Sequence, residues 1–337
     1  MPTPPTWRLG ETPWLDDVPG LPGPGVRVII DNDFSGDPDD LYQVVHHVLS
    51  PAVEVRAIIA SHLAEGEPHQ PTPFTAANAR RRLEELFAVV GLDASDRIFQ
   101  GSDDALVERA TPQDTPAARA IIEEAMRDDP RPLFVACGGG LTEIASAYLL
   151  EPAIAERLTV VWIGGGEYPG LADPPPGTHG AEYNLNIDVT AGQVVFEDST
   201  LALWQVPRDV YRQCLVSDIE LRERVRSRGA LGRFLYDALA EVATTVAAYG
   251  GLRAETYPLG DQPLVLLTAL QSFWQPDTSS SKHVTLPAPR IAADGSAVPR
   301  GDGRTIRVYT QVDTRLMFED MFLKLDVFTR WQRQRQG

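Results

Sequence analysis

The stretch VRVIIDNDFSGDPDD, residues 26–40, governs the interpretation of the whole chain. Its first part is a short apolar run that predicts a buried strand, and Gly36 and Pro38 indicate a turn after it. Carboxylates gathered at a strand end repel one another, and a hard cation with oxygen ligands offsets that repulsion. The stretch therefore predicts a Ca²⁺ or Mg²⁺ site. Its carboxylates belong to Asp31, Asp33, Asp37, Asp39 and Asp40.

Two other interpretations of this stretch stay open at the level of sequence. Acidic loops are often no more than solvated surface. The spacing is also similar to a calcium-binding EF-hand loop, in which Asp31, Asp33 and Ser35 would take the first ligand positions. That pattern breaks at Tyr42, where the loop needs a bidentate Glu, and the apolar run ahead of it predicts a strand.

Composition restricts the class of protein and of partner. A chain of 337 residues can bury a sizeable core, and Cys137 and Cys214 are too few to form a disulfide framework. The net charge of −17 disfavours nucleic acid and anionic membranes as partners, because both would repel the chain. The first residues show no apolar signal-peptide region, and no apolar run approaches the ~18 residues of a membrane span. We expect a cytoplasmic enzyme with a small-molecule substrate.

The pattern along the chain alternates between strands and helices, which implies parallel strand pairing. We expect an extended N-terminal arm over residues 1–25 and one α/β domain over 26–337, with a mostly parallel open central sheet flanked by helices. Strands are expected at 26–30, 54–60, 98–101, 132–136, 158–163 and 202–206, and an antiparallel ribbon at 282–312. Helices are expected at 41–49, 75–90, 115–127, 191–197, 218–228 and 231–248, from within 258–264 to about 272, and from 314 onward.

Two of these strands end in runs of three glycines, at 138–140 and 164–166. Glycine lets a backbone approach a ligand closely or turn a carbonyl toward it. A phosphate-binding loop is disfavoured, because no Lys follows the first run. Open α/β folds bind ligands at the edge where the strands end, although glycine turns also serve packing alone.

Four motifs in this order resemble the inosine-uridine-preferring nucleoside hydrolases. The resemblance covers residues 26 to about 325 and implies a single α/β domain with a Ca²⁺ ion at the strand ends. It also implies hydrolysis of the N-glycosidic bond of a ribonucleoside or related N-riboside, in purine or pyrimidine salvage, and we expect a homodimer or homotetramer. The motifs are the acidic turn, the glycine turn before LTEIA (141–145), AEYN (181–184) and GDQPL (260–264).

The resemblance assigns a metal site residue by residue. Asp33 would ligate Ca²⁺ and act as general base toward a metal-bound water, and Asp40 would chelate the ion. The backbone carbonyl of Gly138 and the carboxylate of Asp261 would complete the site. Asp261 has a simpler explanation as an acidic residue favoured by the dipole of the helix that follows it.

The resemblance also assigns the sugar contacts. Asp39 would hold a ribose hydroxyl, and Glu182 and Asn184 match the sugar-binding pair of the family's AEFN segment. The alternative for this pair is capping of the following helix. Two residues more than usual separate Asp33 from Asp39, which leaves Asp37 without an assigned role.

One departure concerns the leaving group. Gly260 stands where many members of the family place the His that protonates the departing base. The acid must come from elsewhere, or the substrate must leave without one. Candidates are His179, which we also expect at the substrate, His62 and Tyr183.

Two other functions compete with the hydrolase. A haloacid-dehalogenase-like phosphatase also carries Asp-x-Asp at a strand end, with Asp31 as the phosphoryl acceptor. A non-catalytic, metal-dependent binder of nucleosides or sugars would tolerate the loss of the His at Gly260. The hydrolase fits the residue types because carboxylates stabilise an oxocarbenium-like sugar, and because Ca²⁺, a mild Lewis acid, needs a separate base.

Overall fold

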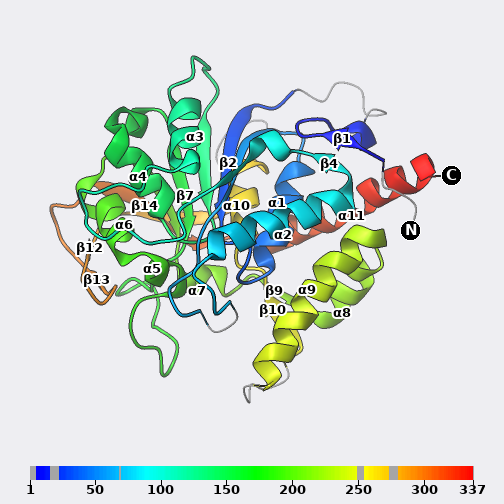
Figure 1. The fold of residues 1–337 in the computed structure, drawn as a ribbon. Helices are drawn as coiled ribbons and strands as arrows, with labels where there is room; N and C mark the ends of the chain where they lie inside the picture. Colours follow the sequence, from blue (N-terminus) through cyan, green and yellow to red (C-terminus); the bar gives the residue numbers. More distant parts are fainter. Residues whose placement is uncertain (1–4, 16–22, 68–69, 249–253, 273–279, 337) are drawn as a thin grey trace.

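A sheet of eight strands runs through the middle of the molecule (Figure 1). The computed structural model describes residues 5–15, 23–67, 70–248, 254–272 and 280–336. The strand order is β11-β14-β8-β7-β6-β2-β3-β5. The strands are β2 Val26–Asn32, β3 Val53–Ala60, β5 Ile98–Gln100, β6 Leu133–Cys137, β7 Thr159–Ile163, β8 Ala202–Val206, β11 Lys282–Pro287 and β14 Thr305–Gln311.

The sheet is parallel except at one edge, as the α/β prediction required. β2 pairs in parallel with both β3 and β6, so that Asp31 lies opposite Ile59 on one side and Cys137 on the other. The antiparallel prediction for 282–312 is confirmed for the β11–β14 pair and wrong for the other side of β14, which pairs in parallel with β8. The ribbon thus extends the main sheet, in which β14 lies between β11 and β8.

Both faces of the sheet are covered by helices, which explains why its strands are apolar almost throughout. Side chains alternate between the two faces: Val28 and Ile30 enter one hydrophobic core and Ile29 enters the other. The first core is closed by α1 Asp39–Val48, α2 Thr75–Val90, α9 Gly229–Ala248, α10 Pro263–Thr268 and α11 Thr314–Gln336. The second is closed by α3 Pro116–Ala125, α4 Thr142–Leu150 and α6 Val189–Gln193.

Several predicted helices differ in detail. α1 begins at Asp39, two residues earlier than predicted, because Pro38 precedes it and acidic side chains suit a first turn. The helices predicted at 191–197 and 218–228 each contain a π-helical segment, Val194–Asp198 and Leu221–Arg226. Short elements complete the fold: β1 Trp7–Arg8, β4 Leu92–Asp93, α5 Tyr183–Ile187, α7 Arg208–Tyr211, β9 Leu215–Ser217, α8 Asp218–Glu220, β10 Thr256–Pro258, β12 Arg290–Ile291 and β13 Ala297–Val298, with 3₁₀ turns at Pro13–Leu15, Ser95–Arg97 and Pro152–Glu156.

The described part of the predicted N-terminal arm is packed onto α11. The rings of Trp7 and Trp14 meet edge to face with centroids 4.8 Å apart, and Trp14 meets Phe328 in the same way at 5.1 Å. Parts of the arm, residues 1–4 and 16–22, lie outside the described residues. In the described part of the chain, none of the helices combines the length and apolar character needed to cross a bilayer.

Candidate active site

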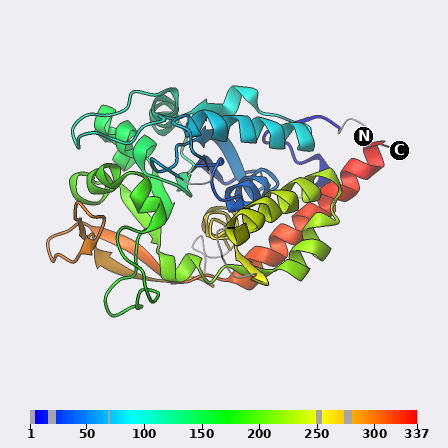
Figure 2. The ribbon, with the colours of Figure 1, turned by 60° about the horizontal axis from the view of Figure 1, so that its bottom comes forward.

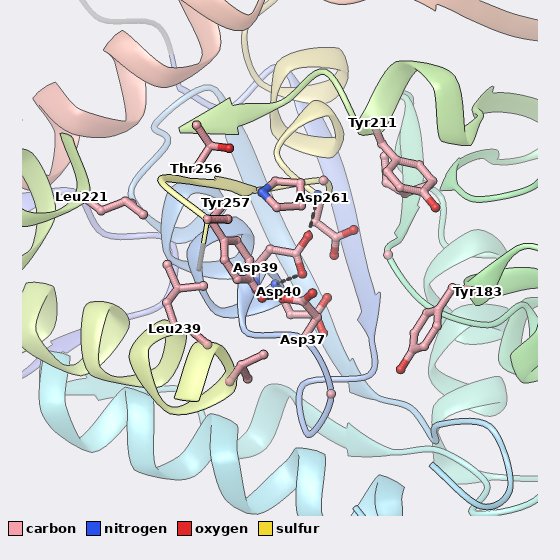
Figure 3. Close-up of a pocket in the computed structure, with 18 of the residues that line it drawn as sticks. Asp37, Asp39, Asp40, Tyr183, Tyr211, Leu221, Leu239, Thr256, Tyr257 and Asp261 are labelled. Atoms are coloured by element: carbon pink, nitrogen blue, oxygen red, sulfur yellow. Dashed lines mark hydrogen bonds between the residues drawn. The ribbon is translucent and has the colours of Figure 1, made fainter. Parts of the chain in front are cut away.

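A cavity of about 910 Å³ opens where β2, β6 and β7 end. The acidic turn after β2 and Gly138 after β6 form its floor, and α9 forms one of its walls. In two views α9 lies alongside α2, next to the acidic turn (Figures 1 and 2). Figure 3 shows the carboxylates of the turn and Asp261 between apolar side chains of Leu221 and Leu239 and the rings of Tyr183 and Tyr211.

Asn32 connects residues that lie far apart in the sequence at this floor. Its amide nitrogen donates to Asp40 Oδ1 at 2.6 Å and to Asp261 Oδ2 at 2.8 Å. Its amide oxygen accepts from the backbone N–H of Gly138 at 3.0 Å. One side chain therefore fixes the carboxylates of α1 and of the segment before α10 against the end of β6.

Gly138 must be glycine for steric reasons. A Cβ at this position would lie 2.0 Å from Asp261 Oδ2 and 2.7 Å from Asn32 Nδ2. The carbonyl of Gly138, expected to ligate the metal, accepts a hydrogen bond from Asn184 Nδ2 at 2.9 Å. A carbonyl oxygen has two lone pairs, so the expected metal role of Gly138 stays a prediction.

Burial raises the pKa values of the clustered carboxyls. The pKa of Asp33 rises from its ordinary value of 3.8 to about 8, through burial first and the charge of Asp261 second. Burial raises the pKa of Asp261 to about 7, and the charges of Asp37 and Glu182 add to it. The pKa values of Asp39 and Asp40 are also raised by burial and by neighbouring carboxylates. Such mutual repulsion is the condition that a bound cation relieves.

The donor set suits a hard divalent cation. One oxygen each from Asp39, Asp40 and Asp261 lie within 4.8 Å of one another. The second oxygen of Asp40, Oδ2, is buried without a hydrogen-bond partner among the described residues. This trio contains Asp39 where the predicted metal set has Asp33, which is 4 % exposed and also lines the cavity. Clustered carboxylate oxygens are the ligands of Ca²⁺ and Mg²⁺.

Glu182 has two structural tasks at the rim. Its Oε2 accepts from the backbone N–H of Leu185 at 3.2 Å, so it caps α5, as one of the two sequence interpretations proposed. The same oxygen accepts from Gly165 N–H at 2.7 Å, and Oε1 accepts from the hydroxyl of Tyr211 at 2.6 Å. Asn184 lines the same part of the cavity.

The three candidate proton donors lie in different places. His62 is 2 % exposed, and its ring nitrogens face Leu63 O and Thr142 Oγ1, away from the residues that line the cavity. His179 is exposed and is not among the lining residues either. Tyr183 does line the cavity, and its hydroxyl donates to Glu67 Oε2 at 2.9 Å.

The chain is similar to a family of known proteins. A family model described as inosine-uridine preferring nucleoside hydrolase matches residues 28–319. The chain belongs to the inosine-uridine preferring nucleoside hydrolase family.

Two curated relatives in the nucleoside hydrolase family carry that same description. The protein from Leishmania major is 37% identical over 117 residues, which are 34% of this chain and 34% of that protein. The protein from Crithidia fasciculata is 41% identical over 91 residues, 27% of this chain and 26% of that protein. The matched segments thus span about a third or less of these relatives.

Solved nucleoside hydrolase structures share the fold over a much larger part of the chain. A plant nucleoside hydrolase superposes with a TM-score of 0.67 at 21% identity, covering 90% of this chain and 99% of that one. A purine-preferring ribonucleoside hydrolase from Gardnerella vaginalis gives 0.66 at 15% identity, with the same coverage. At these identities the likeness concerns the fold, and it confirms the predicted α/β architecture.

The motifs that resembled nucleoside hydrolases converge in space. The acidic turn, Gly138, Glu182 with Asn184, and Asp261 all line the one cavity. Asp261 precedes α10, as the simpler explanation requires, and its Oδ2 also accepts from Asn32 at the floor. Asp31, the nucleophile of the phosphatase alternative, is 1 % exposed, accepts from Ser61 and does not line the cavity.

Sequence reasoning missed three residues of this site. Asn32 stands among aspartates and carries no charge, so the sequence does not single it out. Its place at the end of β2 turns its side chain toward the floor. Tyr211 and Tyr257 line the cavity from α7 and β10, and neither belongs to a motif. Tyr257 donates to Asp37 Oδ1 at 2.5 Å, which gives the unassigned aspartate of the turn a partner across 220 residues.

Proposed function

We propose that this chain hydrolyses the N-glycosidic bond of a ribonucleoside or related N-riboside to ribose and free base, in a reaction that depends on Ca²⁺. The carrying observation is the convergence of Asp39, Asp40 and Asp261, with Asp33 beside them, on the floor of one cavity. Membership of the nucleoside hydrolase family supports the reaction class. The names of the relatives span inosine, uridine and purine substrates, so the base is left open.

Asp33 is the residue that we propose takes the proton from water. It lies on the cavity floor beside Asp40 and Asp261, where an ionised carboxylate can accept a proton from water. When bound by Asp33, Asp40, Asp261 and the carbonyl of Gly138, Ca²⁺ would supply charge that orients the sugar diol and the water. The neighbouring carboxylates then stabilise the positive charge that develops on the sugar.

Asp39, Glu182 and Asn184 are proposed to orient the ribose. Asp39 Oδ2 accepts from the backbone N–H of Asp261 at 3.1 Å, and Oδ1 accepts from that of Asp40 at 3.1 Å. Glu182 is held by three donors, which fixes the carboxylate for contact with sugar hydroxyls. Fixed geometry of this kind contributes to rate by orientation. His179 stays a predicted substrate contact.

The test is the Asp33→Ala variant, with Asp33→Asn as an isosteric companion. We expect both to lose at least about 10²-fold in kcat on inosine, uridine and p-nitrophenyl riboside, because general-base help is worth about 10²–10⁴-fold. The far-UV circular dichroism spectrum should match the wild type. Asp96→Asn, at an exposed aspartate outside the cavity, is the control and should keep full activity.

The competing functions give different results in the same assays. Hydrolysis of p-nitrophenyl phosphate without hydrolysis of any riboside would favour the phosphatase. Ribose binding by calorimetry without release of any base would favour the non-catalytic binder. An Asp33→Ala enzyme that retains full turnover would overturn the assignment of the base.

A further inference from the structure

The cavity carries no histidine or lysine among the described residues that line it. Gly260 offers no side chain, and the space beside it is taken: a Cβ there would lie 3.3 Å from Asp39 Oδ2 and 3.3 Å from the Tyr211 ring. Among the described lining residues, the groups left to protonate a departing base are therefore tyrosines and carboxyls. Three of the carboxyls, Asp33, Asp40 and Asp261, are already assigned above to the proposed metal and to the base.

All four tyrosines that line the cavity already give their hydroxyl hydrogen to a carboxylate. Burial also raises the pKa of the phenols of Tyr183, Tyr211 and Tyr257. Each of these hydroxyl hydrogens is thus already engaged and is not directed at a departing base. The pairs are Tyr183–Glu67 at 2.9 Å, Tyr211–Glu182 at 2.6 Å, Tyr236–Asp218 at 2.8 Å and Tyr257–Asp37 at 2.5 Å.

The charge of the lining is strongly one-sided. Eight carboxylates and a single guanidinium, that of Arg222, line the cavity within the described residues. Arg222 is itself paired with Asp218 at 2.7 Å and lies over the ring of Tyr236. Beyond the metal-binding floor, the wall presents acceptor oxygens and aromatic faces, both of which attract a cation.

We propose that the preferred substrates are ribosides whose aromatic base is positively charged at the glycosidic nitrogen, as in a pyridinium riboside. This inference rests on the proposed hydrolase function and specifies its leaving group. The observation behind it is a cavity rich in carboxylates and in tyrosines whose hydroxyl hydrogens are already engaged, with no histidine or lysine among its described lining residues.

The chemistry of such a substrate balances without a proton donor. Water oxygen forms a bond to C1′, and its proton passes to Asp33. The C1′–N⁺ bond breaks, and its electron pair stays on nitrogen, which leaves as a neutral base. A neutral nucleoside breaks the same bond to give an anion, which leaves more readily when an acid protonates it.

The experiment compares substrates with the Ca²⁺-loaded wild-type enzyme. We expect kcat/KM for nicotinamide riboside to exceed that for inosine and uridine by at least about 10²-fold, the lower bound of what a general acid is worth. Binding to the Asp33→Asn variant, measured by calorimetry, separates affinity from the reactivity of the bond. Nicotinamide riboside should bind that variant more tightly than inosine does. A smaller ratio of kcat/KM, or tighter binding of inosine, would overturn the inference.

Tyrosine variants test the claim that no phenol acts as the acid. Tyr183→Phe, Tyr211→Phe and Tyr257→Phe should each change kcat/KM for inosine and for nicotinamide riboside by similar factors. Tyr168→Phe, which removes a hydroxyl bonded to Gln205 outside the lining, is the matched control. A variant that lowers the inosine value tenfold or more relative to nicotinamide riboside would identify the missing acid and refute the inference; smaller changes support it.

p-Nitrophenyl riboside distinguishes the two ways of failing, because its phenolate leaves without protonation. Wild-type enzyme inactive on this compound and on every nucleoside would refute the hydrolase function itself. Activity on p-nitrophenyl riboside and on inosine, without the preference for nicotinamide riboside, would refute the leaving-group inference alone.

Discussion

Asn32 lies between two buried carboxylates and donates a hydrogen bond to each. Together with Gly138, which has no room for a side chain, it determines how closely β2, β6 and the segment before α10 approach. Side chains that orient metal ligands in this way are worth about 10–100-fold in metal affinity in other proteins.

We therefore predict that Asn32→Leu weakens Ca²⁺ binding by about 10–100-fold, because Asp40 and Asp261 lose the donor that aligns them. Calorimetric titration of Ca²⁺ checks this. Asn78→Leu, whose amide bonds Gln70 outside the main cavity, is the matched control and should bind as the wild type does. Unchanged affinity in Asn32→Leu would show that the carboxylates keep their positions without it.

At this scale the sequence predicted the charged residues and missed their neutral partners. Asp33, Asp39 and Asp40 stand out because carboxylates clustered at a strand end repel one another. Asp261 is indicated only by the resemblance to the nucleoside hydrolases. Asn32 carries no charge and looks like one more residue of a turn, and only the continuation of β2 through it turns it inward.

Among the elements, the short 3₁₀ turn that carries Trp14 has a larger structural role than its length indicates. Trp14 is 8 % exposed and contacts Trp7, Phe328 and Trp331 through edge-to-face rings, so it ties the N-terminal segment to α11. The predicted division into an arm and a domain stays a prediction, and these contacts make it testable.

Trp14→Ala should lower the free energy of unfolding by about 3–5 kcal/mol, the usual cost of removing a large buried aromatic side chain. Urea unfolding followed by circular dichroism measures the change. Trp14→Phe keeps a ring at the position and should lose less. Because Trp14 lies outside the cavity lining, kcat should change little at temperatures where the variant is folded. A loss below about 1 kcal/mol would mean that the arm is dispensable for stability.

Periodicity predicted the order and type of the main elements. It did not predict the π-helical segments or which strand pairs with β14. The π-helical segments Val194–Asp198 and Leu221–Arg226 look like ordinary helix in sequence, because they keep an apolar face. The parallel pairing of β14 with β8 depends on a partner about 100 residues earlier, and alternation within the ribbon carries no information about it.

For the whole molecule, the buried acids link stability to pH and to metal. The folded pKa values of Asp33 and Asp261, about 8 and about 7, lie above the ordinary value of 3.8. Between pH ~4 and ~8 the folded state thus binds more protons at these sites than the unfolded chain, so their contribution to stability is lost as pH rises. The proposed Ca²⁺ would bind the ionised carboxylates and offset their mutual repulsion.

The increase in Tm on adding Ca²⁺ should therefore grow from pH 5.5 to pH 8.5. Differential scanning fluorimetry in Ca²⁺ and in EDTA at each pH measures this increase. Taking the difference in Tm between the two conditions removes the contribution of titratable groups that the ion does not affect. Asp261→Asn should flatten the dependence. An increase that stays constant or shrinks as pH rises would contradict the linkage.

For the whole molecule, the shape of the cavity could not be predicted from the sequence. Four separated motifs predicted that one sheet edge holds the site. The wall opposite the floor depends on side chains such as Tyr257, whose contact with Asp37 joins residues 220 positions apart. In the sequence each of these tyrosines looks like an ordinary partly apolar residue. Its role at the cavity depends on the carboxylate that accepts its hydroxyl hydrogen, and the sequence does not show that partner.

The bond between Asn32 and Asp261 spans 229 residues, which has a consequence for biosynthesis. Chains emerge from the ribosome amino end first, at about 5–20 residues per second. The nascent protein thus spends on the order of ten seconds with its first aspartates translated and their distant partner still unmade. During that interval the proposed calcium ion would find an incomplete chelate, so its loading would have to wait until Asp261 has been added to the chain.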